Sequence, residues 1–86
     1  MTYFELWHTR TNNFMDDFDS AQEAERVFEE AVARDGLKTL AGTYFVRVDD
    51  DGENHLIAED EAILLAVRRL ATAERSDETS PQRHVG

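Results

Sequence analysis

The acidic segment RVDDDGENHLIAED has residue types that bind cations, because four carboxylates surround a single glycine. A calcium loop between two helices needs carboxylates at its first, third and fifth positions, glycine at the sixth and glutamate at the twelfth. With Gly52 at the sixth position, Asp49 and Asp51 fit the third and fifth positions. Arg47 then falls at the first position and Ala58 at the twelfth, so the bidentate ligand is missing. The spacing predicts that this segment is not a calcium loop.

A β-hairpin turn explains the same segment better. The pair Asp51-Gly52 between two alternating apolar runs is the strongest local signal for a hairpin. Two registers remain open. A two-residue loop would set Val46 opposite Ile57, whereas a three-residue loop with a bulge would set Val46 opposite Leu56. Either way, the acids are expected to be solvated turn residues.

A second group of candidate ligands is DDFD, residues 16–19, together with His8. Carboxylates and an imidazole can hold a hydrolytic metal ion. The same acids also suit an edge strand that runs into the start of a helix. Charged side chains on an edge strand block unwanted pairing with other chains, and the helix dipole stabilises negative charge near the helix N-terminus. We favour the edge strand, and neither His55 nor His84 adds a ligand set. No serine or threonine forms a recognisable nucleophile arrangement with a histidine, so we expect no catalytic residue, no metal and no cofactor, and no enzyme.

The aromatic residues near the amino terminus indicate a contact surface instead. If Phe4 and Leu6 face the helices, strand alternation turns Tyr3, Glu5 and Trp7 to the opposite face of the sheet. Tyrosine and tryptophan dominate the energetics of binding surfaces. The alternative is that Trp7 belongs to the core and the two faces are inverted. The sequence leaves both alternatives open.

The elements that position these residues follow from periodicity and turn signals. We expect strands at residues 3–9, 14–19, 43–48 and 54–59, helices at 20–35 and 60–73, and a connector at 37–42. This order, ββαββα, predicts an α+β fold in which an antiparallel four-stranded sheet carries both helices on one face. Residues 1–73 would form a single domain, and 74–86 a disordered tail with almost nothing to bury.

Capping residues and apolar stripes define the two expected helices. Ser20 and Glu23 spell S-x-x-E, a reciprocal capping arrangement, and Asp60 is expected to cap the second helix. Gly36 would end the first helix in a left-handed conformation. The stripes expected to be buried are Ala24, Val27, Phe28, Ala31 and Val32 in the first helix, and Ile63, Ala66, Val67 and Leu70 in the second.

Composition restricts the classes of partner. The formal net charge of −10 on 86 residues opposes binding to nucleic acid and to anionic membranes, because both bind proteins mainly through lysine and arginine. The chain has no cysteine, which excludes disulfides and thiolate chemistry. The segment MTYFELWHTR lacks the pattern of a signal peptide, and no apolar run approaches the ~20 residues of a membrane span. We therefore expect a cytoplasmic protein.

Two segments, FELWHTRTNNFMDDFDSAQEAERVFEEA and VRVDDDGENHLIAEDEAILLA, resemble a family of small bacterial proteins. That family shares Y-E-L-W-D-T-x-T-x-N, then F-D-S/T-x-E-E-A and later an acidic turn with I-A-E-G. The resemblance covers most of residues 3–71, and the chain departs from the pattern at Phe4, His8 and Asp60. It implies no activity, because the family has none assigned. The opening hairpin and helix are also similar in layout to the partial RNase-H-like domain of one antitoxin class.

These observations together favour a non-catalytic protein-interaction module, expected to be a homodimer. The rival hypothesis is an acidic inhibitor that imitates nucleic acid, or an antitoxin-like protein, binding a basic partner. The first hypothesis places the contact on Tyr3, Trp7 and the acidic surface, and the second on acids spread over helix and hairpin. The acidic residues concerned are Glu25, Glu29, Asp49, Asp50, Asp51, Glu53 and Glu59.

Overall fold

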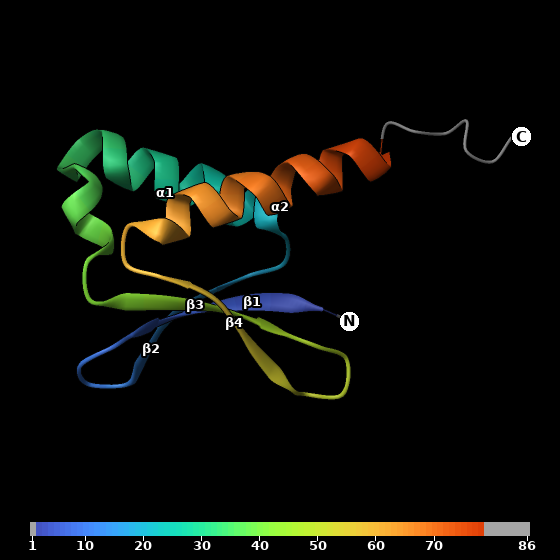
Figure 1. Cartoon of the computed structure of the whole chain (residues 1–86), viewed down its shortest axis with the longest axis horizontal. Coiled ribbons are helices and arrows are strands. Elements are labelled where there is room, and N and C mark those ends of the chain that lie inside the picture. Colours follow the sequence, from blue (N-terminus) through green and yellow to red (C-terminus); the bar gives the residue numbers. More distant parts are fainter. Residues whose placement is uncertain (1, 79–86) are drawn as a thin grey trace, which may run out of the picture.

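The computed structural model describes residues 2–78 and places two helices on one face of a four-stranded antiparallel sheet (Figure 1). The strand order is β2-β1-β3-β4, so β1 and β3 are central and β2 and β4 are edges. This arrangement confirms the predicted ββαββα fold, with the acidic strand at an edge as expected. The elements are β1 (Tyr3–His8), β2 (Asn13–Phe18), α1 (Ala21–Asp35), the short 3-10 helix η1 (Leu37–Leu40), β3 (Thr43–Val48), β4 (Asn54–Glu59) and α2 (Ala62–Glu78).

Phe45 of β3 lies at the centre of the core between the sheet and the helices. Its fully buried ring stacks on Phe4 at 5.4 Å between centroids and meets Phe28 of α1 edge-on at 5.5 Å. Phe18 of β2 contacts both Phe28 and Phe45. Such aromatic pairs add to the hydrophobic effect of burial. The remaining core residues are aliphatic: Leu6, Ala21, Ala24, Leu40, Ile63, Leu64, Val67 and Ala71.

The start of α1 follows its sequence signals closely. Ser20 is the N-cap, and its Oγ accepts the backbone N–H of Glu23 at 3.1 Å. The Glu23 carboxylate reaches back to the N–H of Asp19, one residue before the position expected for a reciprocal cap. Gly36 ends the helix with φ 87°, and its N–H donates to the carbonyl of Val32. The predicted buried stripe of α1 needs one correction: Val27 is exposed, and Ala21 is buried instead.

The beginning of α2 differs from the prediction, since the helix starts at Ala62 and not at residue 60. Asp60 has a positive φ of 54°, outside the helical region. Its carboxylate accepts the backbone N–H of Gly42 at 2.7 Å, and its own N–H donates to the carbonyl of Thr43. Asp60 therefore joins the helix start to the beginning of β3.

The end of α2 also needs correction, because the helix continues to Glu78 where a tail was expected from residue 74. Glu74 accepts the backbone N–H groups of Ala21 and Gln22 at 2.7 and 3.0 Å. These two groups belong to the first turn of α1, whose N–H groups have no partner within their own helix. The extra turn is thus held by a contact with the other helix. The rest of the predicted tail, 79–86, lies outside the described residues.

The β3–β4 hairpin adopts the three-residue loop that the sequence left as one of two alternatives. Val46 lies opposite Leu56, and the N–H of Asp49 donates to the carbonyl of Glu53 at 2.9 Å. Gly52 closes the loop with φ 87°, a conformation that suits glycine. The register then shifts between Phe45 and Val46, which is a β-bulge. The acidic segment is therefore a turn between two adjacent strands, as predicted.

Candidate functional site

The sheet face opposite the helices is the most distinctive surface of the described chain. Phe4 and Leu6 belong to the core beneath the helices, so strand alternation directs Tyr3, Glu5 and Trp7 to the other side, where all three are half-buried. Of the two orientations that the sequence left open, β1 therefore has the one with Phe4 and Leu6 in the core, and Trp7 is not part of the core. Among residues 2–78, no element covers this side of the sheet (Figure 1).

Strand pairing extends this surface over all four strands, because directly paired residues of antiparallel strands share a face. Val46 and Val48 support the assignment: each is only 5% exposed, yet neither belongs to the core cluster under the helices. Their neighbours on the far side of the sheet must therefore cover them. We call this surface the open face, and its residues are Tyr3, Glu5, Trp7, Phe14, Asp17, Tyr44, Val46, Val48, Asn54, Leu56 and Glu59.

A row of aromatic rings crosses the open face. Trp7 lies between Phe14 of β2 and Tyr44 of β3, with ring centroids 5.7 and 6.3 Å away. The Tyr44 hydroxyl donates to Asn12 at 2.6 Å, which holds that end of the row. Phe14 is 50% exposed, and Leu56 on the other edge strand is 58% exposed. The open face therefore offers large apolar groups to solvent from both edges.

Glu5 occupies the middle of β1 on the open face and is held from both sides. The indole Nε1 of Trp7 donates to one carboxylate oxygen at 3.0 Å, and the Tyr3 hydroxyl donates to the other at 3.3 Å. Asp17 is the residue directly opposite Glu5 on β2. Partial burial, the charge and hydrogen bond of Glu5, and the charge of Asp17 raise the pKa of Tyr3. Two carboxylates thus lie side by side among aromatic rings.

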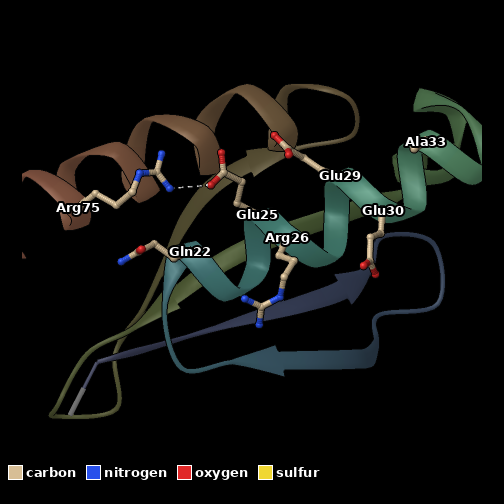
Figure 2. Close-up of a pocket in the computed structure, with 7 residues that line it drawn as sticks. All are labelled: Gln22, Glu25, Arg26, Glu29, Glu30, Ala33 and Arg75. Atoms are coloured by element: carbon tan, nitrogen blue, oxygen red, sulfur yellow. Dashed lines mark hydrogen bonds and ion pairs between the residues drawn. The ribbon is translucent and has the colours of Figure 1, made fainter.

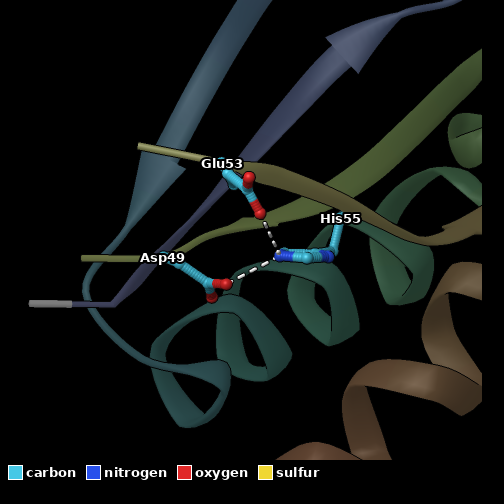
Figure 3. A group of neighbouring side chains, drawn as sticks. All are labelled: Asp49, Glu53 and His55. Carbon is cyan, nitrogen blue, oxygen red and sulfur yellow. Dashed lines mark hydrogen bonds and ion pairs between the residues drawn. The ribbon is translucent and has the colours of Figure 1, made fainter. Parts of the chain in front are cut away.

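The β3–β4 hairpin gathers a second group of polar side chains (Figure 3). The Nε2 of His55 lies 2.6 Å from Asp49 and 4.0 Å from Glu53, and one ligand atom from each residue falls within 4.8 Å of the others. Arg47 already contacts the second oxygen of Asp49 at 3.3 Å. Asp51 takes no part, because its carboxylate accepts the N–H of Glu53 within the turn. Arg47 and His55 therefore already contact both oxygens of the Asp49 carboxylate. Sequence reasoning missed His55 because only the strand register brings it beside Asp49.

The outer side of the helix layer carries a shallow, open pocket (Figure 2). Glu25 of α1 pairs with Arg75 of α2 at 3.1 Å, and Glu29 pairs with Arg68 at 3.0 Å. From the sequence, we expected both glutamates to be available to a partner. The structure places them in ion pairs that join the two helices. Such ion pairs at the surface contribute little to the stability of the fold. Because each carboxylate is paired with an arginine, these two residues do not form a uniformly acidic surface.

The fold does not assemble the metal group of DDFD with His8, which we set aside from the sequence in favour of an edge strand. Asp16 lies opposite Leu6, whereas His8 lies opposite Asn13 at the far end of β1. Among residues 2–78, no group of three metal-binding side chains within ligand reach includes either residue. The Nδ1 atom of His8 is buried without a hydrogen-bond partner near a second shallow pocket. That pocket contains no acidic side chain among its lining residues.

Comparison with known proteins supplies no assignment. No protein-family model, curated protein or solved structure matches this chain. The resemblance to the small bacterial family therefore stays a prediction from the sequence. Within the described part of the chain, neither helix is both long and apolar enough to cross a lipid bilayer. The function has to be inferred from the surface that the fold presents.

Proposed function

We propose that this protein is a non-catalytic interaction module that binds a protein partner through the open face. The supporting observation is the row of Phe14, Trp7 and Tyr44, which lies on a sheet face that no described element covers. Aromatic side chains in such a position bury large areas on binding at little cost in conformational entropy. Exposed apolar surface that spans a whole sheet face is typical of an interface.

Two leucines provide a matched test of this proposal. Leu56 on the open face and Leu65 on α2 are 58% and 55% exposed, so each can be changed to serine at similar cost to the fold. Affinity capture from the native host, quantified against the wild type, should retain the same proteins with Leu65→Ser and lose them with Leu56→Ser. Equal losses with both variants, or equal retention, would remove the open face as the contact surface.

The same pair of variants tests the homodimer expected from the sequence. Sedimentation velocity of the wild type reports self-association directly. A dimer formed through the open face should dissociate with Leu56→Ser or Trp7→Ala and persist with Leu65→Ser. The nucleic-acid mimic has less support, because Glu25 and Glu29 are paired with arginines and Asp49 with Arg47 and His55.

A further inference from the structure

We propose that the open face receives an arginine of a protein partner, which binds across Glu5 and Asp17 between the rings of Tyr3 and Trp7. This inference rests on the proposed function and names the chemistry of the partner. Apart from Asn54 and Glu59 at the two ends of β4, the rest of the open face is apolar or aromatic, so the arginine would be one charged anchor within a largely apolar contact. A basic protein surface, and not a second copy of this chain, is the occupant that fits.

The first observation is a pair of carboxylates without a cation. Glu5 and Asp17 are directly opposite on β1 and β2, a position where like charges repel across roughly 5 Å. Among residues 2–78, no lysine, arginine or histidine lies within ion-pair distance of either carboxylate. Elsewhere the chain does supply arginines to its acids, as for Glu25 and Glu29. The unpaired charge on the open face is therefore a local feature that a cationic partner would relieve.

The second observation is that Glu5 is already oriented. Tyr3 and Trp7 each donate one hydrogen bond to it, so the carboxylate is fixed in place while its remaining lone pairs stay available. The three residues are spaced by two along one strand, which puts a ring about 7 Å to either side of the carboxylate. A planar guanidinium can donate hydrogen bonds to two carboxylates and stack on an aromatic ring at once, which an ammonium cannot do as well. Arginine is thus the cation that suits this geometry.

The third observation concerns the rest of the open face. Val46 lies beside Glu5 on β3 and Leu56 lies beyond it on β4, so apolar groups flank the carboxylate pair. Their burial by a partner would lower the local dielectric and strengthen the ion pair. The net charge of −10 would also speed the approach of a basic partner.

A second copy of the chain fits less well. None of the open-face residues is basic. A two-fold dimer uses the same patch on both subunits, so pairing centred on β1 would bring the two Glu5 carboxylates together. Like charges buried at an interface oppose association. Nucleic acid and anionic membranes are disfavoured by the same repulsion.

The test uses two peptides of sequence Ac-Val-X-Val-X-Val-amide, in which X is arginine or its neutral isostere citrulline. Trp7 is the only tryptophan of the chain and lies on the open face, so its fluorescence reports occupancy directly. We expect saturable binding of the arginine peptide to the full chain and roughly tenfold weaker binding of the citrulline peptide, because only the charged form pairs with the carboxylates. Equal binding of the two peptides would overturn the inference.

Charge-matched variants separate the carboxylate pair from the general negative charge of the protein. Glu5→Gln and Asp17→Asn should each weaken binding of the arginine peptide about fivefold. Glu61 is an exposed acid next to α2, and Glu61→Gln should leave the affinity unchanged. Equal weakening by all three variants would mean non-specific attraction and reject the site. Thermal unfolding of each variant checks that it is folded.

The outcomes also distinguish this inference from the proposed function. If the leucine variants show that a partner binds the open face but neither peptide binds, the partner has other chemistry and the inference fails alone. If the wild type sediments as a dimer that Leu56→Ser dissociates, the occupant is a second copy and the arginine anchor is again rejected. If neither experiment depends on the open face, both proposals fail together.

Discussion

Glu74, in the last turns of α2, accepts the backbone N–H of Ala21 in the first turn of α1 at 2.7 Å. The carboxylate also accepts the N–H of Gln22, so one side chain satisfies two groups that the helix itself leaves without partners. Its negative charge faces the positive end of the α1 dipole. One helix is therefore capped by the other, and the end of α2 is tied to the domain.

The first prediction follows from this cap. Glu74→Ala removes both hydrogen bonds and the charge, and we expect it to lower the free energy of unfolding by about 1–2 kcal/mol. Urea denaturation followed by circular dichroism measures the loss. Glu61→Ala, which changes charge equally at an exposed position, is the control. The capping role is refuted if both variants lose the same stability.

The second prediction concerns the aromatic core. Phe45→Ala removes the ring that contacts Phe4, Phe18 and Phe28, and we expect a loss of about 3–5 kcal/mol. That loss is comparable to the entire stability of a small domain, so the near-ultraviolet signal should disappear at room temperature.

A milder core variant and a surface control complete this test. Ile63→Val should remain folded and lose about 0.5–1.5 kcal/mol, because Ile63 is fully buried. Phe14→Ala, at a half-exposed position of the open face, should cost clearly less than Phe45→Ala. Similar losses for the two phenylalanines would contradict the placement of the core on the helix side of the sheet.

The third prediction concerns the hairpin loop. Gly52 has φ 87°, and a β-carbon built there meets nothing within 4 Å, so the cost of a side chain comes from the backbone alone. We expect Gly52→Ala to cost about 1–2 kcal/mol. Asparagine tolerates this region better, so Gly52→Asn should cost less. Thermal melts of the two variants decide the matter, and an alanine variant as stable as the wild type would exclude a left-handed residue at this turn.

The fourth prediction concerns pH. Partial burial together with Glu5 and Asp17 raises the pKa of Tyr3 above its ordinary value. Because the folded-state pKa is the higher one, the protonated phenol favours the fold below about pH 10. This contribution is lost as the pH rises through the folded-state pKa of Tyr3.

Spectrophotometric titration can follow Tyr3 alone. The chain has two tyrosines, so Tyr44→Phe leaves Tyr3 as the sole source of the phenolate absorbance. In that background, the midpoint should lie above the ordinary tyrosine value and fall when Glu5→Gln is added. An unchanged midpoint would mean that the Glu5 carboxylate does not act on the Tyr3 hydroxyl in solution.

Local signals determined much of this protein. Ser20 and Glu23 marked the start of α1, because capping depends on residues three positions apart. Asp51-Gly52 located the hairpin turn, since only a residue that adopts positive φ closes it well. The alternation along β1 placed Phe4 and Leu6 on one side of the strand and Tyr3, Glu5 and Trp7 on the other, although it left open which side faces the core. Each of these properties is decided within a few residues of the chain.

The tertiary structure decided what depends on distant segments. The sequence could not show that Glu74 would cap α1 or that Arg75 would form an ion pair with Glu25, because the partners are about fifty residues apart along the chain. The register that sets Val46 opposite Leu56 is fixed by the three-residue loop, which the sequence left as one of two alternatives. The open face exists only because four strands lie side by side. Glu5 and Asp17, which have no cationic partner within residues 2–78, come from different strands and become neighbours only when those strands pair.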